Sequence, residues 1–194
     1  MNRSAGGQHV VACLVLAVAL GCGSARPARI PAPPLDPAAV ADAAAAAGGL
    51  EKLPAIASGK AGLDTDGDTK VSRDELIAWL EQVRNSKVAI TSLAVQVTHK
   101  GKPLSGAAVK LVPESCMGGR IQEAAGTTDD SGVAMVAIAG AEYPGVNCGL
   151  YRVEITGSGN DGKPLAAPYN SRSTLGVAVG GMLPESGMAV FELN

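Results

Sequence analysis

The sequence predicts a mainly β fold in which residues 87–194 form a seven-stranded antiparallel β-sandwich, preceded by a short helical segment. In "SLAVQVTH", the apolar residues Leu93, Val95 and Val97 occupy every second position, as in a half-buried strand. Glycine, proline and aspartate separate the apolar runs, with no helical periodicity between them. Strands joined by short turns pair antiparallel, and two such sheets must pack face to face to bury their apolar sides.

The remaining strands follow the same reasoning. "GAAVKLVP" alternates Ala107, Val109 and Leu111, and the other five strands are expected at "EAAGTT", "VAMVAI", "GLYRVEIT", "TLGVAV" and "MAVFEL". A turn is expected at "DDSG", where the local chemistry of a turn explains Asp129 and Asp130 better than acid–base catalysis does.

A helix is predicted over "RDELIAWLEQVRNSK", within a helical segment that we assign to residues 50–86. Its apolar residues Leu76, Ile77, Leu80 and Val83 form one stripe. The preceding "SRDE" is a capping box, with Ser72 at the N-cap and Glu75 three residues later. The stretch upstream of the helix, "LEKLPAIASGKAG", contains proline and glycine and is a poor helix former.

The loop "DTDGDTKVSRDE" before this helix has the ligand spacing of an EF-hand calcium loop. Carboxylates stand at positions 1, 3, 5 and 12, and position 7 offers a backbone carbonyl, so the expected ligands are Asp64, Asp66, Asp68, Lys70 and Glu75. The capping box alone explains Glu75, but it leaves the three regularly spaced aspartates without a role. We therefore predict a calcium site.

Thr69 occupies position 6 of the loop, where EF-hands have glycine because the backbone needs a positive φ. A β-branched residue is strained there, so the predicted affinity is weak, near the 10⁻⁴ to 10⁻³ M of extracellular modules. The alternative is a degenerate loop that binds no metal and only starts a helix.

The N-terminus indicates export. Arg3 is followed by the apolar run "VVACLVLAVAL", which is too short to span a bilayer and suits a signal peptide over residues 1–21. "ALGCG" resembles the lipobox of bacterial lipoproteins, which implies acylation at Cys22 and anchoring to a membrane facing the periplasm or cell surface. An ordinary signal peptide with an incidental cysteine is the alternative. Residues 22–49 are rich in proline and alanine and are expected to form a linker.

Two cysteines, Cys116 and Cys148, remain after the signal and lipid sites are set aside. In an oxidising envelope they are expected to form a disulfide, although two buried thiols that never meet would also fit.

The composition makes some classes of function unexpected. The net charge is −2 and no basic cluster occurs, so nucleic acid is not an expected partner. The only histidine after the signal peptide, His99, stands beside the turn "HKGK" and is expected in an exposed hairpin, so we predict that the protein is not an enzyme. A small-ligand or carbohydrate carrier would favour an aromatic-rich cleft, for which there are only five aromatic residues, namely Trp79, Tyr143, Tyr151, Tyr169 and Phe191.

A family resemblance extends this interpretation. "GKPLSGAAVKLVPE", "GTTDDSGVAMV", "GLYRVEIT" and "APYNSRSTLGVAV" resemble the motifs of carboxypeptidase-regulatory-like (transthyretin-like) domains of bacterial lipoproteins. The resemblance implies a prealbumin-like sandwich over residues 87–194 and no peptidase activity. It suggests an interaction module that faces an envelope protein or a polysaccharide.

Replacing Cys22 by serine is expected to move the protein from the membrane to the soluble envelope fraction, because the acyl chains would be its anchor. Fractionation followed by immunoblotting measures this. A Cys22→Ser protein that still sediments with membranes would contradict the lipoprotein prediction.

Overall fold

The computed structural model describes residues 35–47, 63–66, 68, 70–142, 144–180 and 187–194. The α-helices within these ranges are α1 (Pro37–Ala46) and α2 (Arg73–Ser86), and two short 3₁₀ helices are η2 (Ser115–Met117) and η3 (Ala167–Tyr169). The strands in the same ranges are β1 (Ile90–Thr91), β2 (Leu93–His99), β3 (Lys102–Pro103), β4 (Ala108–Pro113), β5 (Ala124–Thr127), β6 (Val133–Val136), β7 (Val146–Asn147), β8 (Gly149–Thr156), β9 (Leu175–Val179) and β10 (Met188–Leu193).

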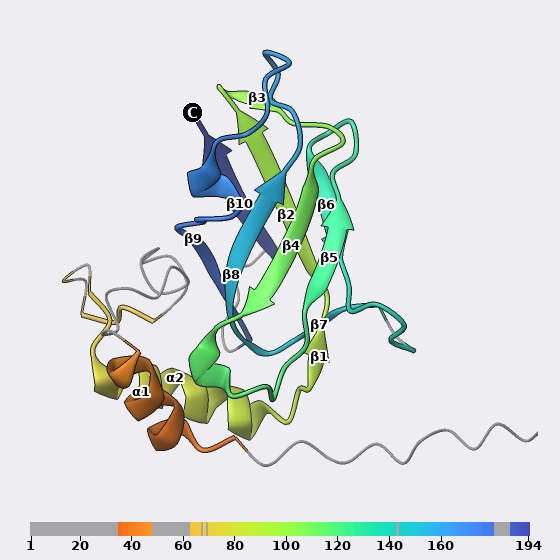
Figure 1. The fold of residues 1–194 in the computed structure, drawn as a ribbon. Coiled ribbons are helices and arrows are strands. Elements are labelled where there is room, and N and C mark those ends of the chain that lie inside the picture. The colour runs from red at the N-terminus through yellow and green to blue at the C-terminus, as the bar shows by residue number, and fades with distance from the viewer. Residues whose placement is uncertain (1–34, 48–62, 67, 69, 143, 181–186) are drawn as a thin grey trace, which may run out of the picture. The chain divides into compact units, whose positions relative to one another are not determined.

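Two four-stranded sheets form the β part of the fold (Figure 1). In the first, β2 has β10 along one edge and pairs with β3 and β6 along the other. In the second, the order is β5-β4-β8-β9. A small two-stranded sheet pairs β1 with β7. The predicted strands thus recur as β2, β4, β5, β6, β8, β9 and β10, which confirms a β-rich fold.

Two details differ from the prediction. The strands β1, β3 and β7 have two residues each, which is too short for alternation to reveal them in the sequence. The prediction of purely antiparallel pairing is wrong for β10, which runs parallel to β2 from Met188↔Ala94 to Leu193↔His99. β10 follows β9, a strand of the other sheet, so pairing with its neighbour in the chain does not set its direction.

The two sheets enclose one hydrophobic core, which we call the sheet core. Leu93, Val95 and Val97 of β2 are buried in it, as the alternation predicted. The opposite sheet contributes inward residues of β4 and β8, namely Val109, Leu111, Tyr151, Val153 and Ile155. Branched aliphatic residues dominate because their side chains pack well on a pleated surface.

The sheets are joined at one side, where β5 and β6 meet. Ala125 and Ala137 exchange backbone hydrogen bonds of 3.0 Å in both directions. Gly126 lies so close to β6 that a Cβ at this position would be 2.6 Å from the carbonyl oxygen of Met135. The absence of a side chain at Gly126 is therefore what lets the two sheets approach here.

A second hydrophobic cluster, the helix cluster, packs α1 and α2 against the outer face of the β5-β4-β8-β9 sheet. Leu76, Trp79, Leu80 and Val83 of α2 are buried in it. Other buried members come from α1, η2, β8 and β9, including Val40, Ala41, Ala44, Met117, Leu150 and Ala178. The segment predicted as a linker over 22–49 thus contains a helix that belongs to the fold.

Gly126→Ala is expected to destabilise the protein by about 1–3 kcal/mol, since the added methyl group meets backbone atoms of β6 that cannot move independently. Thermal unfolding measures the change. Ala125→Ser is the matched control, because Ala125 is exposed and should tolerate a hydroxyl. A Gly126→Ala protein as stable as wild type would show that the strands can separate without cost.

Candidate metal centre

Three aspartates of the acidic loop converge. One carboxylate oxygen from each of Asp64, Asp66 and Asp68 lies within 4.8 Å of the others. Asp64 is half-buried, and Asp66 and Asp68 are exposed. Carboxylate oxygens are hard ligands of the kind that Ca²⁺ prefers. Three negative charges this close repel one another, and a divalent cation would relieve that repulsion.

Local hydrogen bonds set the spacing of these acids. The backbone N–H of Asp68 donates to Asp66 Oδ1 at 3.1 Å, and the N–H of Lys70 donates to Asp68 Oδ1 at 2.8 Å. Asp66 and Asp68 therefore each accept from the backbone N–H two residues later, as in an Asx turn. The turns hold the alternate acids on one side of the loop. Thr69, whose substitution for glycine was the main departure from the EF-hand pattern, lies outside the described residues.

Glu75 lies elsewhere than the EF-hand spacing predicts. It does not join the aspartate cluster, and its two oxygens accept hydrogen bonds from both ends of the loop. Oε1 accepts from the N–H and hydroxyl of Thr65 at 2.7 and 2.8 Å, and Oε2 accepts from the N–H and hydroxyl of Ser72, each at 2.9 Å. The predicted capping box is confirmed, since the N–H of Glu75 also donates to Ser72 Oγ.

These bonds lower the pKa of the Glu75 carboxyl. The backbone N–H of Ser72 makes the largest contribution, followed by the N–H and hydroxyl of Thr65 and the hydroxyl of Ser72, and together they bring the pKa to about 2. The carboxylate is thus ionised at every physiological pH. The contact with Thr65 was not predicted, because a capping box involves only residues at the start of the helix.

The loop is anchored on both sides by the helix cluster. Leu63 precedes the first aspartate and Val71 follows Lys70, and both are buried in that cluster. Asp42 of α1 accepts a hydrogen bond from Arg73 Nε at 2.9 Å, which ties α1 to the first residue of α2. The acidic loop is therefore placed by tertiary packing on each flank.

Cys116 and Cys148 are free thiols in the structure, so the disulfide predicted between them is not formed there. Cys116 is buried in the helix cluster, and Cys148 is half-buried against it. Burial, aided by the nearby Glu114 carboxylate, raises the pKa of Cys116 to about 11, and burial also raises the pKa of Cys148. Few thiolates form at neutral pH under these conditions, so both thiols are weak nucleophiles.

His99 departs from its predicted exposure. It ends β2 beside the Lys100–Gly101 turn, as expected, but the residue is only 5% exposed. Its Nδ1 accepts a hydrogen bond of 2.9 Å from the backbone N–H of Asn160. The prediction of an exposed hairpin histidine is wrong because the loop after β8 covers the ring, a contact between residues 61 positions apart that the sequence does not reveal.

The lipid site Cys22 lies outside the described residues. Among the residues that are described, no helix is long and apolar enough to cross a membrane. No family model, curated protein or solved structure matches the chain. The carboxypeptidase-regulatory-like resemblance therefore stays a prediction that rests on the quoted motifs.

Glu75→Gln is expected to remove a pH dependence of stability between pH 4.5 and about 2. The pKa is lower in the folded protein than the ordinary value of 4.5, so the carboxylate stabilises the fold above that pH and loses this effect as the pH falls toward 2. Wild type should therefore melt higher than Glu75→Gln at neutral pH, and the difference should vanish near pH 2.

Circular dichroism melting curves across this pH range make the measurement. Glu81→Gln is the matched control, since Glu81 lies on the same helix and pairs only loosely with Arg84 at 3.7 Å. An equal pH response in both variants would mean that the loop contacts of Glu75 do not contribute.

Proposed function

We propose that the chain is a lipid-anchored cell-envelope protein in which a weak calcium site stabilises the acidic loop and a β-sandwich acts as an interaction module. The observation that carries the calcium proposal is the convergence of Asp64, Asp66 and Asp68 within 4.8 Å. Calcium would be structural, holding the three aspartates of the loop together, and not a cytosolic-type signal.

The donor set fits a weak, open site. Three carboxylates offer hard oxygens, and the carbonyl of Lys70 is the further ligand that the EF-hand spacing suggests. Glu75 would have to give up its bonds to Thr65 and Ser72 to become a ligand. Millimolar affinity is the expectation, because a loop that keeps those bonds leaves part of the ion's shell to water.

The module proposal rests on the two sheets around a common core and on the motif resemblance, which points to a prealbumin-like sandwich. The outer face of the β10-β2-β6 sheet carries two of the most exposed large apolar side chains of the described residues, Met135 at 65% and Val190 at 53%. These two side chains are apolar area that a partner of the module could cover. The envelope partner would be a protein or a polysaccharide.

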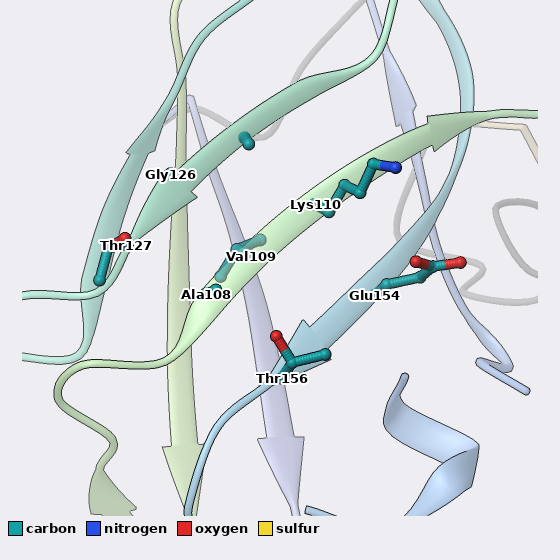
Figure 2. A pocket seen from close by; sticks show the side chains of 8 residues that line it. Ala108, Val109, Lys110, Gly126, Thr127, Glu154 and Thr156 are labelled. Carbon is teal, nitrogen blue, oxygen red and sulfur yellow. The ribbon is translucent and has the colours of Figure 1, made fainter. Parts of the chain in front are cut away.

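A second candidate function, a small-ligand or carbohydrate carrier with a loop that binds no metal, is favoured by a hollow on the other sheet. The hollow has a volume of about 450 Å³ and lies on the outer face of β5, β4 and β8 (Figure 2). Volumes of this size are common for ligand sites. Its lining residues are Ala108, Val109, Lys110, Ala125, Gly126, Thr127, Glu154 and Thr156.

The chemistry of this hollow suits a hydroxylated ligand. Ala108 forms part of the floor, with Thr127 and Thr156 as its register partners on either side. Lys110 and Glu154, which are register partners on β4 and β8, add one charge of each sign, and each forms an ion pair with another residue, Glu123 and Arg152 respectively (Figure 2). The threonine hydroxyls can donate and accept hydrogen bonds. No aromatic side chain lines the hollow, which makes this the weaker proposal for a sugar.

Asp66→Asn is expected to weaken calcium binding by roughly tenfold or more, because it removes one charge from the cluster while the amide oxygen can still accept from Asp68. Isothermal titration calorimetry and melting curves at millimolar calcium measure this. Wild type should release or absorb heat and melt higher with calcium.

Asp74→Asn is the matched control. Asp74 lies next to the loop in the first turn of α2, its side chain is 96% exposed, and it is not part of the cluster. It should bind calcium like wild type. The calcium proposal fails if wild type shows neither heat nor a melting shift, and that outcome would favour the carrier with a degenerate loop.

A further inference from the structure

The loop at residues 157–164, between β8 and η3, covers one end of β2. The backbone of Gly159 lies against the ring of His99, since a Cβ at this glycine would be 2.5 Å from Cε1 and 2.8 Å from Nδ1. The next N–H, that of Asn160, donates to Nδ1 at 2.9 Å. Because Nδ1 accepts this bond, the imidazole is neutral and carries its proton on Nε2.

The side chain of Asn160 fastens the same loop to the β2–β3 hairpin. Its two N–H groups donate among three carbonyl oxygens around the amide nitrogen, those of His99 at 3.0 Å, Lys102 at 3.3 Å and Pro103 at 3.3 Å. In Figure 1 this loop lies beside β3, at the far end of β8 from the helices. Asn160 thus contacts the imidazole ring of His99 through its backbone and the β2–β3 hairpin through its side chain.

We propose that His99 is a pH-sensitive latch: the neutral imidazole holds loop 157–164 against the β2–β3 hairpin, and protonation of Nδ1 releases it. A proton on Nδ1 would point at the N–H of Asn160, so the acceptor is lost and two donors face each other. The ring is almost fully buried and Gly159 lies against it, so the ring cannot turn away unless the loop moves.

Charged residues flank the ring on the side of the loop and on the side of β3, whereas its neighbour on β10 is apolar. Asp161 of the loop accepts a hydrogen bond from Lys100 Nζ at 2.8 Å. Lys102 is the register partner of His99 on β3, and β10 presents the apolar Leu193. The Lys100 contact, with the N–H of Lys163, holds the pKa of Asp161 at about 2, so this carboxylate keeps its charge while a histidine titrates.

The loop can move as a unit because several of its own bonds are internal. The N–H of Gly159 donates to the Lys163 carbonyl at 2.7 Å, and the N–H of Gly162 donates to the Gly159 carbonyl at 2.9 Å. Gly157, with a φ of +143°, precedes this turn and lies at one end of the moving segment. Glycine tolerates such a φ and its neighbouring values, so Gly157 is a suitable hinge.

The test is amide hydrogen exchange by NMR on the full protein at about pH 7.5 and pH 5.5, with each rate compared to the intrinsic rate at that pH. In wild type, the protection of the Asn160 amide should fall by roughly 5- to 10-fold at the lower pH, the loss expected for one hydrogen bond. In His99→Gln, whose amide oxygen can accept without titrating, protection should not depend on pH.

The Gly132 amide serves as an internal control, because it donates to the Asp129 carbonyl in a turn that has no histidine. Should His99→Gln fail to fold, wild type alone decides: the chemical shifts of the Asn160 amide and of the His99 Cε1 proton should titrate with one midpoint. The latch is refuted if Asn160 keeps its protection while His99 titrates, or if His99→Gln loses protection in the same way.

Discussion

The first residues of β8 are buried on both faces of the strand. The arrangement of the two sheets and the helices depends on this constraint. Tyr151, Val153 and Ile155 face the sheet core, whereas Leu150 faces the helix cluster. A strand with one face in water would leave the helices without a surface on which to pack. Because Leu150 and Ala178 of β9 are apolar on the outer side, α1 and α2 can pack there, and Leu63 and Val71, which flank the acidic loop, are buried with them.

Further along β8 the outer face changes character. Glu154 and Thr156 replace the apolar residues, and the face opens into the hollow beside Ala108. The outer face of β8 is therefore covered by the helix cluster at the start of the strand and open at the hollow near its end. The His99 contact lies past the open end, in the loop that follows Thr156. The helix cluster thus contacts the first residues of β8, and the His99 contact lies beyond its last residue.

Glu75 illustrates how one carboxylate can serve two structural roles. It completes the capping box of α2 and also binds the start of the acidic loop through Thr65. Charge-assisted bonds from backbone N–H groups are strong, so the helix start and the loop start are held together without a metal. A calcium ion at the three aspartates would add to an arrangement that already exists, which is consistent with a weak structural site.

Several features were determined by the sequence alone because they depend on neighbours in the chain. The alternation of Leu93, Val95 and Val97 identifies the buried face of β2, and Ser72 with Glu75 identifies the start of α2. The turn at Asp129 follows equally from local chemistry, since its Oδ1 accepts from Ser131 and Val133. The spacing of the three aspartates likewise predicted a cluster that the structure places together.

Other features were decided only by tertiary structure, because they join residues far apart in the chain. The parallel pairing of β10 with β2, the packing of α1 on α2 and the bond from Asn160 to His99 each depend on where distant segments meet. Glu75 makes one contact of each kind, local and long-range. Its bond to Ser72 spans three residues and could be predicted, whereas its bond to Thr65 spans ten and requires the loop to fold back onto the helix. Local hydrogen bonding and side-chain periodicity can be predicted from the sequence. Long-range contacts form only when the sheet core and the helix cluster bring distant segments of the chain together.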